Sequence, residues 1–231
     1  MPTVSSAFLA AVSADPARPL LTWYDDATGE RTELSGATLA NWVAKTANLL
    51  VDGCGLGPGS IAAIDLPPHW QTASLYLSAW TAGLSVATAA EAVDVAFIGP
   101  TSSSADAADV FAVGLHPFAL PVRDLAPGVQ DWVSSARVHG DHYRGPLPTG
   151  TDLALGAFTH DSLVSFASDR AAAMGLTPGT RVLLTVDDHS DVVDWLVAPL
   201  VAGCTLVLSA HTPPSTLDAR AAVERAVLPP R

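Results

Sequence analysis

The chain has 231 residues, 49% of them hydrophobic and 15% charged, which is typical of a globular protein and excludes a disordered segment. Its formal net charge is −12, and Lys45 is its one lysine. An acidic surface repels nucleic-acid phosphates and anionic lipids, so we expect neither nucleic-acid binding nor membrane binding. Cys54 and Cys204 lack zinc or redox spacing, so we expect a cytoplasmic protein without a metal site.

The first 88 residues alternate between β-rich and helical patterns, separated by glycine, proline and aspartate turns. The expected helices are residues 4–14, 36–52 and 69–82. The expected strands are residues 20–24, 31–34, 61–66 and 84–88, the first two forming a hairpin. Ser35 is placed to cap the second helix, and Lys45 lies off its apolar stripe, where it is expected to face solvent. The first helix lacks a basic start, so we expect no signal peptide, and no apolar run approaches the length of about 18 residues that a membrane span needs.

The alternation continues through the rest of the chain. The expected strands are residues 93–98, 111–115, 181–186 and 205–209. The expected helices are an alanine-rich stretch that runs to about residue 110 and residues 160–174, 191–201 and 216–226. Residues 116–151 are rich in proline, glycine and aspartate and show little periodicity, so they are expected to form an irregular linker.

Strands that alternate with helices of this length predict an α/β fold, a mostly parallel, doubly wound sheet flanked by helices. We expect one domain over 1–231, with a possible division into 1–115, the linker 116–151, and 152–231. Ligands bind beyond the carboxyl ends of the strands in such folds. The loops predicted to face a ligand are 66–70, 99–104 and 186–191.

Residues 17–90 carry an ordered set of motifs, from ARPLLTWYDDATGERTELS to GLGPGSIAAIDLPPHW and TAGLSVAT. This stretch resembles the opening of the adenylate-forming superfamily, which contains acyl-CoA synthetases, peptide-synthetase adenylation domains and luciferases. The family's hairpin, helix, glycine turn, strand and helix follow in the same order. Ser60 stands in the glycine turn where the family usually has an aspartate.

A second stretch, DLAL followed by THDSLVSFASDRAAAMGLTPGTRVLLTVDDHSDVVDWLVAPLVAGCTLVLS, resembles the family on both sides of its phosphate loop. The loop itself, a Ser/Thr/Gly run that ends in Pro-Lys-Gly, is missing between Leu155 and Thr159. The resemblance therefore implies about the first half of a family member, truncated before the later nucleotide motifs and the domain that carries the catalytic lysine. We expect a mainly parallel fold like the N-terminal subdomains of these enzymes.

Losing the loop removes the donors that stabilise the transferred phosphates, at about 3–4 kcal/mol for each donor. The sequence therefore predicts a non-catalytic or degenerate AMP-binding-like protein, with no catalytic residues, that serves as a ligand-binding or protein-interaction scaffold. ATP, AMP or CoA remain conceivable ligands. The alternative is an AMP-forming ligase like an acyl-CoA synthetase, or one half of a split one, that activates a carboxylate with ATP.

Candidate ligand-binding residues come from two sources. Thr101, Ser102 and Ser103 follow a strand and are placed to hold an anion, although a serine run is more often a solvated helix cap. The resemblance adds three positions. Thr159 lies at the start of the helix that follows the family's loop. His189, preceded by Asp188, lies at the position of the family's substrate-side histidine. A plain surface loop remains an equal interpretation of His189.

An alternative site is suggested by RVHGDHYR, in which His139, Asp141 and His142 are close together. Such residues move protons or bind metals, but a solvated loop is the more frequent explanation. The missing half of the family fold is expected to leave apolar edges exposed. We therefore expect a homo-oligomer or a protein partner, in addition to a small acyl or nucleotide ligand.

Overall fold

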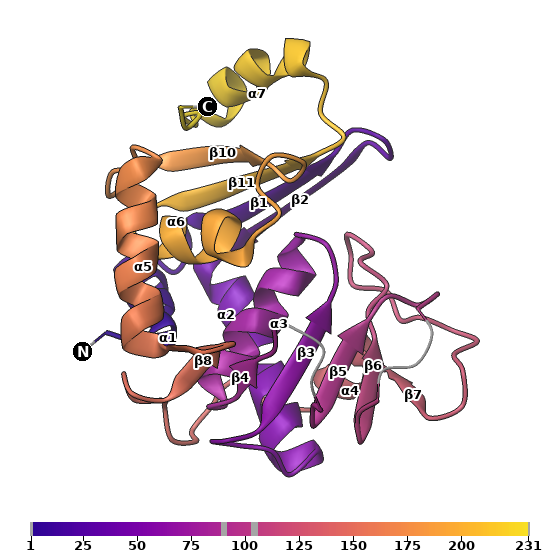
Figure 1. The fold of residues 1–231 in the computed structure, drawn as a ribbon. Coiled ribbons are helices and arrows are strands. Elements are labelled where there is room, and N and C mark those ends of the chain that lie inside the picture. Colours follow the sequence, from indigo (N-terminus) through magenta and orange to yellow (C-terminus); the bar gives the residue numbers. More distant parts are fainter. Residues whose placement is uncertain (1, 89–91, 103–105, 231) are drawn as a thin grey trace.

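The computed structural model describes residues 2–88, 92–102 and 106–230, and its strands form two sheets (Figure 1). A four-stranded sheet has the order β10-β11-β1-β2, and a seven-stranded sheet has the order β7-β6-β5-β3-β4-β8-β9. The mixed α/β class and the mostly parallel pairing that the sequence predicts are confirmed. The seven-stranded sheet is the predicted, mostly parallel one, and the four-stranded sheet is a second sheet that the sequence did not reveal.

The four-stranded sheet joins the two ends of the chain. Strands β1 (Pro19–Asp25) and β2 (Glu30–Ser35) form the predicted hairpin, and β10 (Arg181–Thr185) and β11 (Thr205–Ala210) add to it in parallel. Leu21 lies opposite Leu206 in this register. The pairing of sequence-distant strands therefore ties residues 19–35 to residues 181–210.

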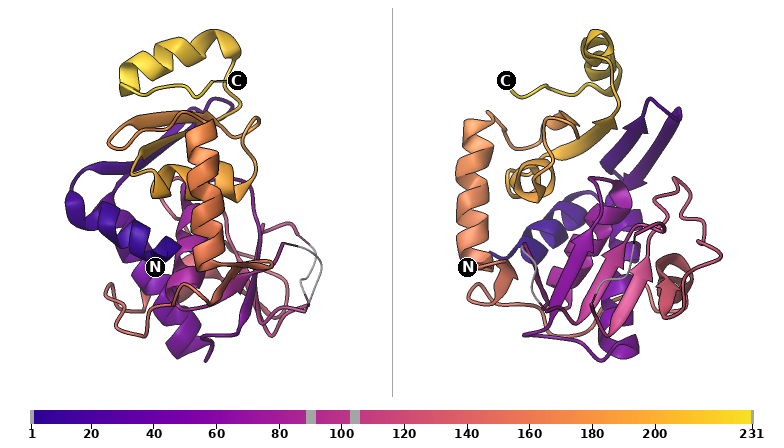
Figure 2. Two further views of the ribbon diagram at one scale, coloured as in Figure 1. Left: turned by 60° about the vertical axis from the view of Figure 1, so that its left-hand side comes forward. Right: turned by 45° about the vertical axis from the view of Figure 1, so that its right-hand side comes forward.

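Helix α7 (Leu217–Glu224), preceded by the short turn η3 (Pro214–Thr216), covers the outer face of this sheet (Figures 1 and 2). Arg220 holds both oxygens of Asp26, at 2.6 and 3.0 Å, and its guanidinium lies 4.3 Å from the ring centre of Tyr24. Arg181 donates to Glu224 over 2.7 Å. These largely buried charges act together with a small apolar cluster, in which Leu217 and Ala221 of α7 pack against Leu183 and Val207, to hold the C-terminal helix in place.

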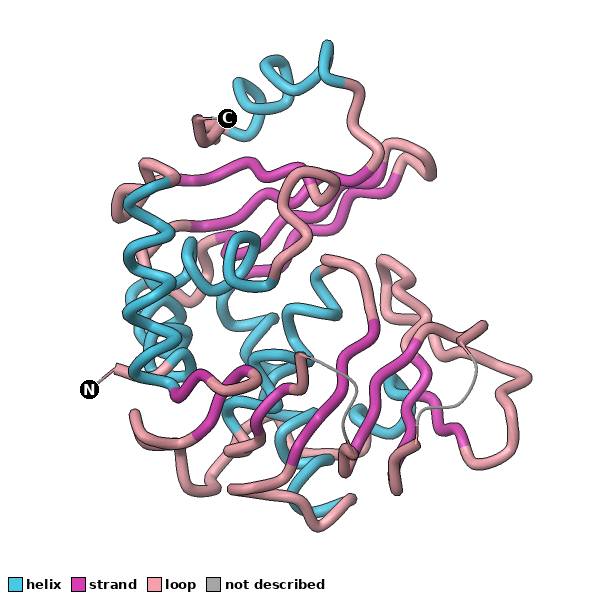
Figure 3. The backbone as a smooth tube through the Cα atoms, viewed as in Figure 1, coloured by secondary structure: helices cyan, strands magenta, loops and turns pink. Residues whose placement is uncertain are grey.

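The seven-stranded sheet is parallel except at one edge. Its strands are β3 (Ile61–Asp65), β4 (Ser85–Val86), β5 (Val95–Ile98), β6 (Asp109–Ala112), β7 (Val129–Asp131), β8 (Leu153–Leu155) and β9 (Phe158–Thr159). Strand β9 runs antiparallel to β8 as the return of a hairpin. Long loops connect β6 to β7 and lead into β8 (Figure 3).

Helices pack between and around the two sheets. They are α1 (Val4–Ala14), α2 (Gly36–Asn48) with its π-helical end η1 (Leu49–Gly53), α3 (Trp70–Thr81), α4 (Trp132–Arg137), α5 (His160–Ala173), η2 (Val193–Val197) and α6 (Ala198–Val201). Helix α3 is buried along nearly its whole length and contacts strands of both sheets. In the described part of the chain, no helix has the length and apolar character needed to cross a lipid bilayer.

Tryptophans fill the core and fasten distant elements. Trp70, Trp80, Trp132 and Trp195 are among the largest fully buried side chains. Trp80 Nε1 donates to the carbonyl of Ala154 over 2.7 Å, which links α3 to β8. Burial of aromatic side chains of this size is a major stabilising contribution in a chain of this length.

Most helices begin at the residues the sequence indicates, and Ser35 caps α2 as expected, accepting from the N–H of Thr38. The helix expected to run to residue 110 is wrong over its described part, because 106–108 are bends and β6 begins at Asp109. Residues 103–105 lie outside the described residues. The expected linker 116–151 contains β7 and α4, which are too short to show a period in sequence.

Candidate functional site

A two-residue turn lies at the position where the resemblance to the adenylate-forming superfamily predicts a phosphate loop. Strand β8 turns at Gly156 and Ala157 directly into β9, with Leu155 opposite Phe158. The N–H of Gly156 donates to the carbonyl of Val86 over 2.8 Å. Gly156 has a φ of +51°, and a Cβ at this position would lie 2.6 Å from Oγ1 of Thr88. The turn is therefore packed tightly against the end of β4.

The N–H groups in the first turn of α5, which follows this hairpin, donate hydrogen bonds to acceptors within the protein. Such groups form anion sites when they point to solvent. Here His160 donates to the carbonyl of Asp152 over 2.9 Å, and Asp161 donates to that of Gly150 over 2.8 Å. Ser162 donates to Oγ1 of Thr159 over 3.3 Å, so Thr159 is a helix cap.

The same region is acidic. Asp161 lies in the first turn of α5, and Asp152 accepts from the N–H of Thr149 over 2.7 Å. That hydrogen bond lowers the pKa of Asp152, which therefore stays ionised near neutral pH. His160 is fully buried, and burial lowers its pKa, so it adds no positive charge. Two carboxylates, with no free cation beside them in the described part of the chain, make this position unfavourable for a triphosphate.

Lys45, the only lysine of the chain, does not serve a ligand there. It is half-buried, which corrects the expectation that it faces solvent, and its Nζ donates to the carbonyl of His139 over 2.8 Å. The helical pattern placed it off the apolar stripe correctly. It did not reveal that the loop after α4 passes over that face of α2.

The carboxyl ends of the two sheets meet around His69, at the end of the predicted loop 66–70. His69 is 2% exposed and caps α3, its Nδ1 accepting from the N–H of Gln71 over 3.1 Å. The proton of the neutral ring is therefore on Nε2. Burial lowers the pKa of His69 to about 3. Trp23, from β1 of the other sheet, meets this imidazole edge to face with ring centres 4.7 Å apart.

Several buried polar atoms around this junction have no hydrogen-bond partner among the described residues. They are Trp23 Nε1, His69 Nε2, Trp70 Nε1 and Gln71 Oε1. Three of them are donors and one is an acceptor. Unpaired buried polar atoms are rare in folded proteins. The rings of Trp23 and Trp70 both contact that of His69, with ring centres 4.7 and 5.7 Å apart, so three of these atoms belong to one group of side chains.

Asp25 and His211 form a polar rim beside the junction, and sequence reasoning missed both. His211 Nδ1 and Asp25 Oδ1 lie 2.8 Å apart at the ends of β11 and β1. This bond raises the pKa of His211, which has a left-handed backbone at φ +52°. The strand ends at Asp25 and at residue 209 were visible in sequence. Their pairing, across 186 residues, was not.

Asp188 and His189 lie after the carboxyl end of β10, as predicted, in a cleft of about 700 Å³. The cleft is also lined by Arg170, Ala173, Met174, Pro214, Pro229 and Pro230. Asp188 accepts from the hydroxyl of Thr185 over 2.7 Å, and Nδ1 of His189 lies 3.1 Å from the carbonyl of Thr185. Arg170 is neutralised by a two-pronged pair with Asp194. The cleft can therefore receive a polar ligand, but none of the described residues that line it offers a free guanidinium for a phosphate.

The other predicted positions do not converge on this cleft. Thr101 and Ser102 are exposed after β5 of the seven-stranded sheet, whereas Asp188 and His189 follow a strand of the four-stranded sheet. Ser103 lies outside the described residues. The role of Thr101, Ser102 and Ser103 in anion binding stays a prediction.

The alternative site is brought together only in part. His142 Nδ1 and Asp141 Oδ1 lie 2.8 Å apart, on an exposed loop. The ring of His139 lies against Gly53 at the end of η1. Within residues 2–88, 92–102 and 106–230, no group of three or more histidine, cysteine, aspartate or glutamate side chains is arranged to hold a metal ion.

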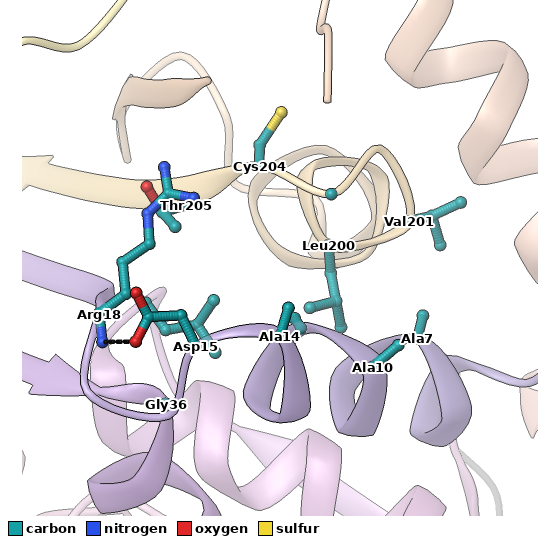
Figure 4. A pocket seen from close by; sticks show the side chains of 13 residues that line it. Ala7, Ala10, Ala14, Asp15, Arg18, Gly36, Leu200, Val201, Cys204 and Thr205 are labelled. Carbon is teal, nitrogen blue, oxygen red and sulfur yellow. Dashed lines mark hydrogen bonds between the residues drawn. The ribbon is translucent and has the colours of Figure 1, made fainter. Parts of the chain in front are cut away.

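A further hollow, of about 320 Å³, lies between α1 and α6 at the amino ends of β1 and β11 (Figure 4). Alanines of α1 and Leu200 and Val201 of α6 line it, and Asp15 accepts from the backbone N–H of Arg18 at its end. It lies at the edge of the four-stranded sheet opposite to Asp25. Its position is not where ligands bind in parallel sheets.

Comparison with known proteins identifies the family. No model of a protein family matches the chain. A Mycobacterium tuberculosis protein described as a TIGR03089 family protein is 40% identical over 240 aligned residues, which cover 96% of each chain. The chain belongs to the TIGR03089 family.

Solved structures place this TIGR03089 protein in a known architecture. A Brucella canis acyl-CoA synthetase superposes with a TM-score of 0.76 at 16% identity, over 98% of this chain and 47% of the synthetase. Apo MatB from Rhodopseudomonas palustris gives 0.70 at 18% identity, covering 98% and 49%. The N-terminal domain of FACL13 from Mycobacterium tuberculosis gives 0.68 at 16%, covering 98% and 62%. The TIGR03089 chain thus has the fold of the N-terminal part of adenylate-forming enzymes and spans about half the length of the full synthetases.

Proposed function

We propose that this protein is a non-catalytic binding scaffold that keeps the adenylate-forming fold and does not use ATP. One observation carries the proposal, namely that the first turn of α5 donates its N–H groups to Asp152, Gly150 and Thr159. A phosphate-binding loop works by presenting such groups to the ligand. In this chain they are committed to the fold, beside two carboxylates.

The energetic cost of adding ATP chemistry to this edge is large. Each donor missing from a site that stabilises developing charge costs about 3–4 kcal/mol, or about 10²–10³ in rate. The N–H of Gly156 in the tight turn is not available to a phosphate, because it donates to the carbonyl of Val86. Lys45 is engaged with His139. No described cation is therefore available at this edge to replace the lysine in the phosphate loop of the adenylate-forming superfamily.

The junction around His69 supports binding of a small ligand by the scaffold. Its unpartnered N–H groups, on Trp23, His69 and Trp70, suit the oxygens of a carbonyl or carboxyl group. Their position at the carboxyl ends of both sheets is where ligands bind in α/β folds. We place a small acyl ligand there, with the cleft at His189 as a neighbouring polar surface.

A second copy of the chain is the partner that we propose for the exposed edge of the seven-stranded sheet. Strand β9 is the last strand in the sheet order. Phe158 and Phe166 stack on each other beside it, with ring centres 5.5 Å apart, and are 38% and 48% exposed. An unpaired strand edge flanked by exposed aromatic rings is a typical self-association surface.

A ligand panel tests the proposal. Thermal unfolding is measured with ATP and Mg²⁺, with AMP, with CoA, and with short carboxylic acids. A ligand at 100 times its dissociation constant stabilises the protein by about 2.7 kcal/mol. We expect no stabilisation by ATP or AMP and a shift with one of the acids. A clear shift with ATP and Mg²⁺ would favour the alternative, an AMP-forming ligase.

A further inference from the structure

Residues 227–230, which we call the strap, follow helix α7 and form one wall of the cleft at His189. The chain reverses direction at Arg225, which has a left-handed backbone with a φ of +50°, and then runs along the outer edge of β10 (Figure 2). Pro229 and Pro230 line the cleft, as His189 does. A short segment at a sheet edge therefore borders a cavity of about 700 Å³.

Within the described residues, two backbone hydrogen bonds attach the strap to β10, and Val227 makes both of them. Its N–H donates to the carbonyl of Arg181 over 2.8 Å, and its carbonyl accepts from the N–H of Leu183 over 2.9 Å. Val227 is thus paired in parallel with Val182, as a single bridge. Each such bond contributes only about 1 kcal/mol to stability. The attachment is therefore weak compared with the stability of a whole domain.

The sequence of the strap prevents a longer attachment. In a parallel ladder, every second residue of a strand bonds to the same neighbouring strand. The next donor after Val227 would be residue 229, which is a proline and has no N–H. Pro230 has none either, and the N–H of Leu228 donates to no described residue. Consecutive prolines favour an extended backbone, so they form a stiff wall that is not bonded to the sheet.

Few apolar contacts hold the strap down. Val227 is 46% exposed and Leu228 is 39% exposed. On the side of the cleft, a Cβ placed on Gly175 would lie 3.8 Å from Cδ of Pro230, which is an ordinary van der Waals contact. A segment with few buried apolar side chains and few backbone hydrogen bonds opens locally at a lower cost than the domain unfolds.

Helix α7, in contrast, is attached at several points. Arg220 makes a two-pronged ion pair with the β1–β2 turn, Glu224 is bonded to Arg181, and the apolar side chains of the helix pack on the sheet. The N–H of Ala226 donates to the carbonyl of Ala221 over 2.8 Å, which closes the end of the helix. The boundary between the two segments therefore falls after Ala226, so the strap can leave β10 while α7 stays docked.

Met174 provides a native marker for the state of the strap. It lies at the end of α5, lines the cleft and is only 5% exposed. It precedes Gly175, the residue that Pro230 approaches. Release of the strap removes this neighbour, so the sulfur of Met174 becomes accessible to a reagent in solution when the strap is open.

We propose that residues 227–230 are a lid, which opens and closes the cleft at His189 by breaking and remaking the two hydrogen bonds of Val227. The role of the lid in admitting a ligand rests on the proposed function, whereas its opening does not. The opening is measured on the full chain without a ligand, so its failure is distinguishable from failure of the ligand panel.

Hydrogen exchange followed by NMR tests the opening. The N–H of Leu183 reports the bond to the strap, and the N–H of Thr205, which donates to the carbonyl of Thr180 over 2.9 Å, reports the pairing of β11 with the start of β10. We expect Leu183 to be protected at least about a hundredfold less than Thr205, and less than the N–H groups of α7. Protection of Leu183 equal to that of Thr205, or to that of α7, would overturn the proposal.

Two proline variants separate the bonds of Val227 from general effects of proline. Val227→Pro removes the N–H that donates to Arg181 and is expected to lower the protection of Leu183 about tenfold, the equivalent of about one hydrogen bond. Leu228→Pro is the matched control, because the N–H that it removes is bonded to none of the described residues. It is expected to change this protection less than about twofold. Equal effects of the two variants would contradict the proposal.

Oxidation of Met174 by tert-butyl hydroperoxide, followed as an initial rate by mass spectrometry, tests whether the strap covers the cleft. The rate is expected to be low in the unchanged protein, to rise about tenfold in Val227→Pro, in step with the population of the open strap, and to stay low in Leu228→Pro. An unchanged rate in Val227→Pro, despite faster exchange of Leu183, would show that the strap moves without opening the cleft and would overturn the proposal.

Discussion

The backbone N–H of Gly156 donates to the carbonyl of Val86 over 2.8 Å, which fixes the β8–β9 turn against β4. This bond occupies the position at which a phosphate loop would leave the sheet. The turn is therefore a structural element of this fold and not a shortened binding loop. The fixed turn, the capped start of α5 and the two nearby carboxylates each disfavour phosphate binding at this edge of the sheet.

Gly156→Ala is expected to destabilise the protein by about 2–4 kcal/mol. The new Cβ would meet Thr88 at 2.6 Å, and the residue would also keep a left-handed backbone. Gly55→Ala is the matched control, because Gly55 has a φ of +71° with nothing within 4 Å of its Cβ, and should cost about 1–2 kcal/mol. Urea unfolding of both variants gives the comparison. Equal losses would mean that the turn can move away from β4.

Stability is expected to fall as the pH drops below about 6.5. Folding holds His69 neutral, with its pKa lowered to about 3, and lowers the pKa of His160 as well. The unfolded chain takes up these protons below 6.5 while the folded chain does not, so each histidine contributes up to about 1.4 kcal/mol per pH unit of lost stability. Denaturant unfolding between pH 6.5 and 5 measures this slope.

The His69→Asn variant isolates the contribution of His69 to that slope. Asparagine can still cap α3 through its side-chain oxygen but does not titrate. Its stability should depend less steeply on pH than that of the unchanged protein. His211, whose pKa is raised by Asp25, has the opposite sign, because its contribution is present below 6.5 and is lost as the pH rises through its folded pKa. A slope that stays the same in His69→Asn would contradict the buried, neutral state of this ring.

Arg220→Ala is expected to cost about 2 kcal/mol and to release α7 from the four-stranded sheet. Arg220 makes a two-pronged pair with Asp26 at 14% and 26% side-chain exposure and lies over the ring of Tyr24. Arg220→Lys keeps the charge but not the fork, and should retain less than half of this contribution. Hydrogen exchange of residues 217–224 reports the release. Protection that is unchanged in Arg220→Ala would show that apolar contacts alone hold the helix.

Phe166→Ser is expected to dissociate a homodimer. The stack of Phe158 and Phe166 stands beside the free edge of β9, where a second copy is proposed to pack. Val223→Ser is the control, since Val223 is 77% exposed on the distant helix α7. Sedimentation should give the mass of two chains for the unchanged protein and for Val223→Ser. The mass of one chain for the unchanged protein would contradict the dimer.

The order of strands and helices followed from local chemistry. Ser35 and Thr159 cap helices, and the apolar periods of residues 36–48 and 160–173 mark those helices without any tertiary information. The division into two sheets was not predictable in this way. Residues 19–25 join residues 205–210 through parallel pairing, and single-strand patterns do not encode a partner at that separation.

The candidate site was predicted only in part, for the same reason. The loop 66–70 was expected to face a ligand, but the burial of His69 depends on Trp23 from the other sheet. The pairing of Asp25 with His211 likewise depends on two strand ends meeting. Lys45 was misplaced because a helical period describes one helix and not the loop that crosses it. The contacts between elements that lie far apart in the chain were therefore the part of the site that could not be predicted from the sequence.

ATP–pyrophosphate exchange with a panel of carboxylic acids tests the central claim most directly. The account predicts exchange no greater than in reactions without protein, for the unchanged chain and for Lys45→Met alike, because no donor at the start of α5 is free to hold a triphosphate. Acid-dependent exchange by the purified chain, with an acyl-AMP detected as product, would contradict it.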